Sequence, residues 1–149
     1  DFVAMLYDHV VIDLPRTWRP WTDAILGASN RIYVVTDMTV PGLRFARRLS
    51  DKIAERLDGP VQPQVIVNRF TSGVGNGLRA SDVEKALNGS YAGSVGNNYG
   101  LVREAIDRGL ALEDVRPNNN VSADIARILF SETAPTTWKS RAIDFFSRF

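Results

Sequence analysis

Short apolar runs that do not alternate with polar residues are the feature that most constrains this fold. The first run, Val-Val-Ile at 10–12, leads directly into Asp13 and is followed by Pro15. Such a run is typical of a strand buried on both faces, as in a parallel sheet covered by helices. We therefore predict a first strand at 10–13, and the later runs at 31–36 and 64–69 predict two more. A weaker apolar pattern at 91–95 predicts the fourth strand.

Segments with helical periodicity separate these strands. Apolar residues recur at helical spacing, for example at Ala46, Leu49 and Ile53. The predicted helices cover residues 20–28, 39–57, 82–87, 99–108 and 123–132, with Ser81 and Ser122 as N-caps of the third and the last. Strands that alternate with helices predict an α/β fold: an open, mostly parallel sheet with helices on both faces.

The chain is predicted to divide at Pro135. Residues 1–134 form one domain in this interpretation, and residues 135–149 form an appended amphipathic helix. Trp138 and Phe145 lie on one face of that helix, with basic residues beside it. We expect the helix to dock on the protein's own surface or on a neighbouring domain; weak attachment to an anionic membrane surface is the alternative.

Composition excludes several kinds of site. The net charge of +1 by itself predicts neither nucleic-acid nor membrane binding. Without cysteines, the chain has no disulfides and no thiolate metal sites. No apolar stretch reaches the roughly 20 residues that a membrane span needs.

A phosphate-binding loop is missing from the sequence. Such a loop needs glycine amides followed by a lysine and a hydroxyl, as in Gly-x-x-x-x-Gly-Lys-Ser/Thr. No lysine follows a glycine run, and the glycine-rich segment 73–78 also fails the dinucleotide fingerprint. Because the chain starts at Asp1, a few residues before a predicted core strand, we expect it to be the later part of a larger protein. On its own it is not expected to hydrolyse ATP.

Polar residues stand at the ends of the predicted strands. Asp13 follows the first, Thr36 and Asp37 end the second, and Asn68 with Arg69 ends the third. Ligands bind at the carboxyl ends of the strands in such sheets, so these residues would line one binding edge. Asp13 suits a magnesium-directed carboxylate, and it suits equally a residue that caps the turn before the proline.

Asn68 and Arg69 are candidates for binding a nucleotide base. The Asn68 carboxamide offers a donor and an acceptor, the set that reads an adenine edge. Arg69 could stack on a base or reach a phosphate, or else form a surface ion pair with Asp37 or Asp82. The loop after the fourth strand, around Gly96, could close over the same base or be an ordinary strand-to-helix turn.

Several segments together resemble the MinD/ParA class of deviant P-loop ATPases. The resemblance rests on Asp13–Leu14–Pro15–Arg16, on Trp18 and Trp21, on the strand at 32–35 and on Val65–Ile66–Val67–Asn68–Arg69. It includes the segment 98–109 and spans residues 7–129. Within the class, the chain is most similar to the TadZ/CpaE pilus-assembly proteins. The fold implied is an incomplete P-loop NTPase-like domain.

The resemblance implies a nucleotide site. Asp13 matches the Walker B aspartate, which orients magnesium through water, and Asn68 and Arg69 match the adenine-side pair. Gly96 and Asn97 fall in the loop where relatives often carry a proline and an acidic residue, so this loop departs from the family pattern. ATP and Mg²⁺ are the implied cofactors of the full-length protein, and neither is expected to bind tightly to this chain alone.

Partners and a location are also implied by the resemblance. Relatives dimerise with nucleotide between the subunits, and Trp18 and Trp21 are the predicted interface residues. Trp21 is expected to pack under its own helix and Trp18 to be the more exposed of the two. Other pilus-assembly proteins are further implied partners. The implied location is the bacterial cytoplasm, with membrane association or a polar position as additional options.

Three functions stay open at this point. The first is a TadZ/CpaE-like ATPase that localises or assembles a type IVb (Flp/Tad) pilus machine. The second is a ParA-like DNA-partitioning ATPase, and the third is a non-catalytic protein-interaction module. Five basic residues crowd one predicted helix: Arg44, Arg47, Arg48, Lys52 and Arg56. Asp51, Glu55 and Asp58 are interleaved with them, which favours a solvated face over a DNA-binding one.

Overall fold

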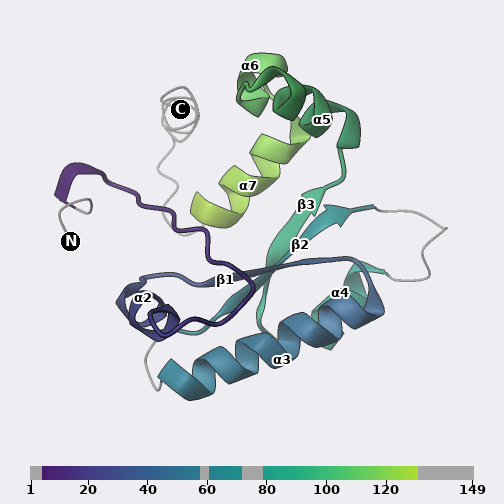
Figure 1. The fold of residues 1–149 in the computed structure, drawn as a ribbon. Coiled ribbons are helices and arrows are strands. Elements are labelled where there is room, and N and C mark those ends of the chain that lie inside the picture. The colour runs from purple at the N-terminus through teal and green to yellow at the C-terminus, as the bar shows by residue number, and fades with distance from the viewer. Residues whose placement is uncertain (1–4, 58–60, 72–78, 131–149) are drawn as a thin grey trace.

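A three-stranded parallel sheet forms the centre of the computed structural model, which describes residues 5–57, 61–71 and 79–130. The strands are β1 (Tyr33–Asp37), β2 (Gln64–Phe70) and β3 (Tyr91–Gly96), in the spatial order β1-β2-β3 (Figure 1). All three lie where the apolar runs predict them. The predicted α/β class with an open parallel sheet is therefore confirmed.

Helices cover both sides of this sheet. They are α2 (Thr22–Ala28), α3 (Val40–Leu57), α4 (Ala80–Leu87), α5 (Tyr99–Arg108), α6 (Leu112–Val115) and α7 (Asn120–Phe130). Figure 1 shows α2, α3 and α4 on one side of the sheet and α5, α6 and α7 on the other. The short helix α6 lies between the predicted helices at 99–108 and 123–132, where the sequence predicts no helix.

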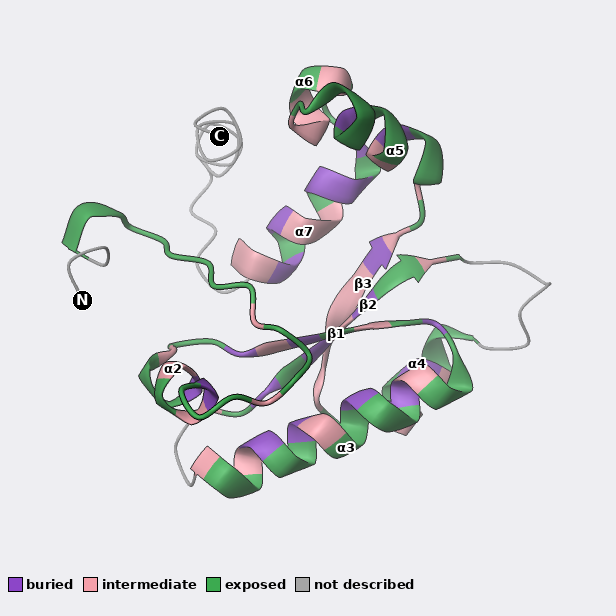
Figure 2. Ribbon diagram, viewed as in Figure 1, coloured by how far each residue is buried: buried purple, intermediate pink, exposed green. Residues whose placement is uncertain are grey.

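The larger core lies between the sheet and helices α3 and α4. Val65 and Val67 of β2 are completely buried there, and so is Val83 of α4. The buried positions of α3 recur every three or four residues, as predicted: Leu43, Ala46, Ser50 and Ile53. Burial of this stripe holds α3 parallel to the sheet and leaves its opposite face in solvent (Figure 2).

A smaller core forms on the other side of the sheet, under α7. Val95, Val121 and Ile128 are buried in it, and Ile66 packs against them. The strand comes very close to the helix at Gly93, where φ is +154° and a Cβ would lie 2.8 Å from Ile128 Cγ1. Glycine at this position therefore allows α7 to pack directly on β3.

The prediction of a strand at 10–13 is wrong. Val11 is 76% exposed and Ile12 is 54% exposed, and the segment runs as an exposed chain outside the sheet (Figures 1 and 2). A strand needs a neighbour to satisfy its backbone groups, and among the described residues β1 pairs only with β2. The second face of β1 is only partly covered, since Tyr33 packs against the smaller core while Val35 is 62% exposed. The described sheet thus has three strands where four were predicted.

Two helix starts also differ from prediction. Arg79 precedes α4 and its backbone nitrogen donates to Asp82 Oδ2 at 2.9 Å, so Ser81 lies inside the helix. At α7, Asn119 Oδ1 accepts a 2.9 Å hydrogen bond from the Ser122 backbone nitrogen. Asn119 is therefore the cap of α7 in place of Ser122, because an asparagine oxygen reaches the first-turn amides as well as a serine oxygen does.

The predicted domain boundary at 135 and the appended helix at 135–149 lie outside the described residues. Within the part of the chain that is described, no helix is long and apolar enough to cross a membrane.

Candidate functional site

The carboxyl ends of the three strands meet at one edge of the sheet. Asp37, the last residue of β1, lies opposite Asn68 of β2. The backbone nitrogen of Asn97 donates a 2.9 Å hydrogen bond to the Phe70 carbonyl oxygen, which joins the exits of β3 and β2. This edge therefore brings together four of the residues that the sequence singles out: Asn68, Arg69, Gly96 and Asn97.

At the end of β1, the Asp37 carboxylate is held beside the first turn of α3. Thr39 Oγ1 donates to Asp37 Oδ1 at 2.8 Å, and the Gly42 backbone nitrogen donates to Thr39 Oγ1 at 3.1 Å. A Cβ at position 42 would overlap Asp37 Oδ1, so only glycine leaves room for this arrangement. The positive end of the helix dipole favours a carboxylate at this place.

At the end of β2, the backbone is fixed in an uncommon conformation. Asn68 Oδ1 accepts a 2.8 Å hydrogen bond from the Arg69 backbone nitrogen, and Arg69 has φ +54°. Non-glycine residues adopt the left-handed region rarely. Both side chains are exposed. Within the described ranges, Arg69 forms no ion pair with Asp37 or Asp82, so its guanidinium is available to a ligand.

The end of β3 is held by residues that sequence reasoning missed. The Gly96 backbone nitrogen donates to Asp124 Oδ2 at 2.8 Å, and Asn98 Nδ2 donates to Asn120 Oδ1 at 2.7 Å. A Cβ at Gly96 would lie only 2.9 Å from Asn120 Nδ2. The one sequence signal for this network is the four-residue spacing of Asn120 and Asp124, which places both on one face of α7.

Asp13 is not part of this edge. It lies in the exposed segment that precedes Leu14, which packs against the larger core. Among the described residues, Asp13 makes no hydrogen bond and no ion pair. The predicted grouping of Asp13 with Asp37 and Asn68 depends on a strand at 10–13, and that strand is not formed here.

The exposure expected for the two tryptophans is reversed. Trp18 is half-buried and packs against the larger core, with the Arg56 guanidinium 5.0 Å from its ring centroid. Trp21 is 46% exposed, because α2 turns Thr22 and Leu26 inward. The prediction that Trp18 is the more exposed residue is therefore wrong, since the preceding chain folds it back onto the core.

Carboxylates are spaced singly around the strand exits. In the described part of the chain, no group of three or more His, Cys, Asp or Glu side chains could hold a metal ion. Single carboxylates suit Mg²⁺, which keeps several waters and is bound through one or two carboxylates together with phosphate oxygens. Asp37, at the exit of β1, fits that pattern of ligation and does not fit a cage made of protein groups alone.

Comparisons with known proteins agree with this fold. No protein-family model matches the chain, and no curated protein sequence matches it either. Among solved structures, it is similar to the crystal structure of a ParA family ATPase from Chlorobium tepidum TLS, with a TM-score of 0.72 and 16% sequence identity. The match covers 89% of this chain and 53% of the other, so the chain spans about half the length of that ATPase. The described residues therefore have part of a ParA-like P-loop NTPase fold.

Proposed function

We propose that this chain is part of a TadZ/CpaE-like ATPase that localises or assembles a type IVb (Flp/Tad) pilus machine. The observation that carries nucleotide binding is the polar carboxyl edge on a ParA-like fold, since nucleotides bind at that edge in open α/β sheets. The pilus assignment rests on the sequence resemblance alone, at residues 13–16, at Trp18 and Trp21, and at 65–69.

In this proposal, Asn68 and Arg69 receive the adenine of ATP. The Asn68 amide nitrogen and the second lone pair of its oxygen supply the donor and the acceptor that an adenine edge requires. The exposed Arg69 guanidinium can stack on the base. Gly96 and Asn97 lie on the other side of the base in this proposal, and the Asp124 carboxylate keeps that loop in place through the Gly96 backbone.

The phosphates are proposed to be held by residues outside the printed sequence. The 149 residues contain no phosphate-binding loop, and the similar ATPase is almost twice as long as the region it shares with this chain. A further strand on the free edge of β1 would give the segment 10–13 a partner and carry Asp13 to the carboxyl edge. Bound Mg²⁺ would neutralise phosphate charge, with Asp13 orienting it through water.

The proposed assembly is a nucleotide-dependent homodimer in the bacterial cytoplasm that contacts other pilus-assembly proteins, near the membrane or a cell pole. Trp21 is the better interface anchor of the two tryptophans, because its indole is 46% exposed while Trp18 packs on the core.

A nucleotide-binding comparison tests the proposal. The full-length protein is titrated with fluorescent ATP and GTP analogues in the presence of Mg²⁺, as wild type and as Asn68→Ala. We expect Asn68→Ala to reduce the preference for ATP over GTP by at least about fivefold, because a base edge then lacks its polar partner. The matched control is Asn30→Ala, an exposed asparagine just before β1, at the opposite end of the sheet.

Two further results bear on the same proposal. Asp13→Ala should weaken the Mg²⁺-dependent part of binding or turnover. An ATP preference that Asn68→Ala leaves intact would remove Asn68 from the site, and a full-length protein that binds no nucleotide would overturn the proposed ATPase altogether.

A further inference from the structure

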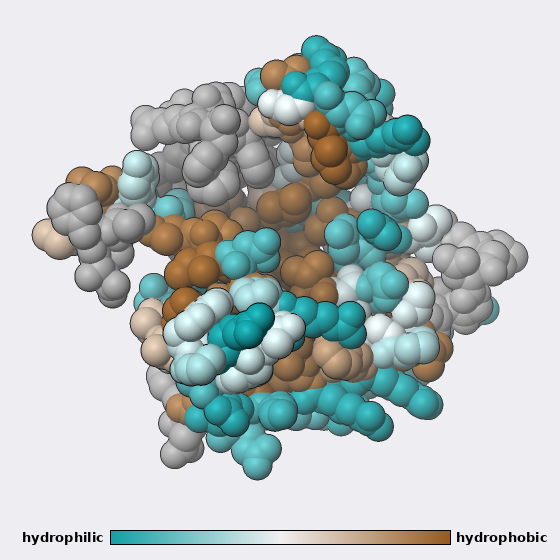
Figure 3. Space-filling view, in the orientation of Figure 1, coloured by the Kyte–Doolittle hydropathy of each residue, from teal (hydrophilic) through white to brown (hydrophobic). Residues whose placement is uncertain are grey.

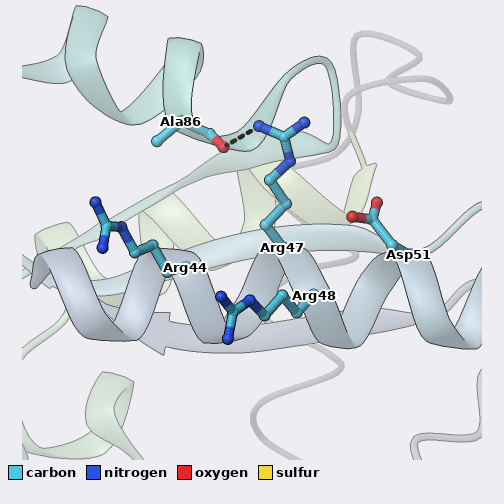
Figure 4. Close-up of a pocket in the computed structure, with 5 residues that line it drawn as sticks. All are labelled: Arg44, Arg47, Arg48, Asp51 and Ala86. Atoms are coloured by element: carbon cyan, nitrogen blue, oxygen red, sulfur yellow. Dashed lines mark hydrogen bonds between the residues drawn. The ribbon is translucent and has the colours of Figure 1, made fainter.

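The outward face of α3 carries two adjoining hollows, which we call the arginine groove. One hollow, of about 380 Å³, is lined by Arg44, Arg47, Arg48, Asp51 and Ala86 (Figure 4). The other, of about 310 Å³, is lined by Val40, Pro41, Arg44, Phe45 and Arg48. Arg44 and Arg48 belong to both, so the hollows form one continuous surface. It lies on α3 outside the buried stripe, between the first turn at Val40 and the contact of Arg47 with α4.

Positive charge dominates the first hollow. Figure 4 shows three arginines that fan out from two turns of α3, and Arg47 donates to the Ala86 carbonyl oxygen at 3.3 Å. In the described part of the chain, Arg44 and Arg48 make no ion pair. Like charges three and four residues apart on a helix repel each other. A ligand with negative charge would relieve that repulsion.

The second hollow adds an apolar surface beside this charge. Phe45 is 47% exposed and Val40 is 48% exposed, on a helix whose other apolar side chains point inward. The Arg16 guanidinium lies 4.9 Å from the centroid of the Phe45 ring, which brings a fourth arginine to the same place. An exposed aromatic ring surrounded by arginines is typical of the anchoring part of a protein interface.

We propose that the arginine groove binds an acidic segment of a partner protein. Carboxylates of that segment pair with Arg44 and Arg48, because the planar guanidinium binds a carboxylate through two parallel hydrogen bonds. An apolar side chain of the same segment packs on Phe45 and Pro41. This inference does not depend on nucleotide binding, since it uses none of the residues that are proposed to hold the nucleotide.

An acidic peptide fits this groove better than a nucleic acid does. Asp51 lines one end of the groove and Glu55 follows one turn later, so a phosphate backbone continuing along α3 would meet negative charge. Figure 3 shows hydrophilic side chains along the side of the molecule formed by α3, and the whole chain has a net charge of only +1. A phosphate backbone would also leave the apolar side chains of Phe45 and Val40 exposed to solvent.

Fluorescence anisotropy tests the proposal with two probes and the full 149-residue chain. The first probe is a short fluorescein-labelled peptide of glutamates with leucine and one phenylalanine; the second is a labelled DNA duplex. We expect the peptide to bind at low salt, and Arg44→Glu to weaken it by about tenfold or more. Lys52→Glu is the matched control, because it makes the same charge change on the same helix outside the groove, and it should change the affinity less than about twofold.

The remaining variants separate charge from apolar contact. Phe45→Ala should weaken peptide binding, whereas Tyr99→Ala, which removes an aromatic side chain that is 67% exposed on α5, should not. Arg48→Glu repeats the charge test if Arg44→Glu lowers the helical circular dichroism signal. The proposal is overturned if the peptide fails to bind the wild type, if Lys52→Glu weakens binding as much as Arg44→Glu does, or if the duplex binds more tightly than the peptide and is released by Arg44→Glu.

Discussion

The carboxylate of Asp124 in α7 accepts a 2.8 Å hydrogen bond from the backbone nitrogen of Gly96 at the end of β3. This contact connects a helix to a strand exit that lies far away in the sequence. It holds the loop that is proposed to cover the base, although Asp124 itself faces the protein and not the ligand.

Removal of this carboxylate should loosen the β3 exit. We expect Asp124→Ala to lower the free energy of unfolding by about 1–3 kcal/mol, because a partly buried backbone donor loses a charged acceptor. Arg127→Ala is the control, since it removes only the exposed ion pair of Arg127 with Asp124 and should cost less than about 0.5 kcal/mol. Urea unfolding measures both. Equal losses in the two variants would mean that the ion pair, and not the Gly96 contact, accounts for the effect.

Alanine at position 42 should fail to stabilise the protein, even though the position lies in a helix. Alanine normally stabilises a helix interior by about 1 kcal/mol relative to glycine. Here a Cβ would overlap Asp37 Oδ1, so in Gly42→Ala the exposed carboxylate has to turn away from α3, and the loss of its hydrogen bond with Thr39 should offset the usual gain from alanine. Gly100→Ala in α5 is the control, because its Cβ would meet nothing within 4 Å and should be neutral or stabilising. A stabilised Gly42→Ala variant would contradict the placement of Asp37 beside α3.

Stability should fall in acid through Asp23. Two hydrogen bonds from Arg56, at 3.0 and 2.5 Å, hold the pKa of the Asp23 carboxyl below its ordinary value of 3.8. A pKa lower in the folded state than in the unfolded state adds stability above the unfolded pKa, and this stability is lost as the pH falls through the folded pKa. Asp23→Asn should therefore flatten the decline in urea midpoint below pH 3.8. Asp107→Asn removes a carboxylate from another exposed ion pair, with Arg103, and serves as the comparison. If the urea midpoint of Asp23→Asn falls with pH as steeply as that of the wild type, Asp23 is not the group that lowers stability in acid.

The two tryptophans should have opposite roles. Trp18→Ala should lower the free energy of unfolding by about 1–3 kcal/mol, because it removes a half-buried ring from the larger core and from the Arg56 guanidinium. Trp21→Ala should leave stability within about 0.5 kcal/mol of the wild type. In sedimentation of the full-length protein with ATP, Trp21→Ala should weaken the dimer. A dimer that persists in Trp21→Ala would place the interface elsewhere.

Much of the fold could be predicted because its signals are local. The strands at β1, β2 and β3 follow from apolar runs, and α5 ends as predicted at Gly109, which adopts a left-handed conformation with φ +61°. The buried stripe of α3 follows from its helical periodicity. In each case neighbouring residues alone carry the pattern, so no knowledge of the tertiary contacts is needed.

The failures have a tertiary cause. The run at 10–12 has the composition of a strand, but a strand forms only where its backbone groups pair with a neighbour, and among the described residues this segment pairs with no strand. Trp18 is covered by Arg56, which lies 38 positions later in the chain. Asp124 was missed for the same reason, because its partner Gly96 lies in a different element.

In the part of the chain that the structure describes, no strand pairs with the outer edge of β1, and this bears on how the protein behaves in solution. A strand edge with open backbone groups and exposed side chains such as Val35 is a template on which other chains add further strands. Two copies that pair through this edge about a twofold axis form a closed dimer, whereas pairing of β1 with the β3 edge of another copy repeats without closing and leads to aggregates. A net charge of +1 supplies little electrostatic repulsion against it. Coverage of this edge, more than the charge of the surface, is therefore expected to set the solubility of the protein.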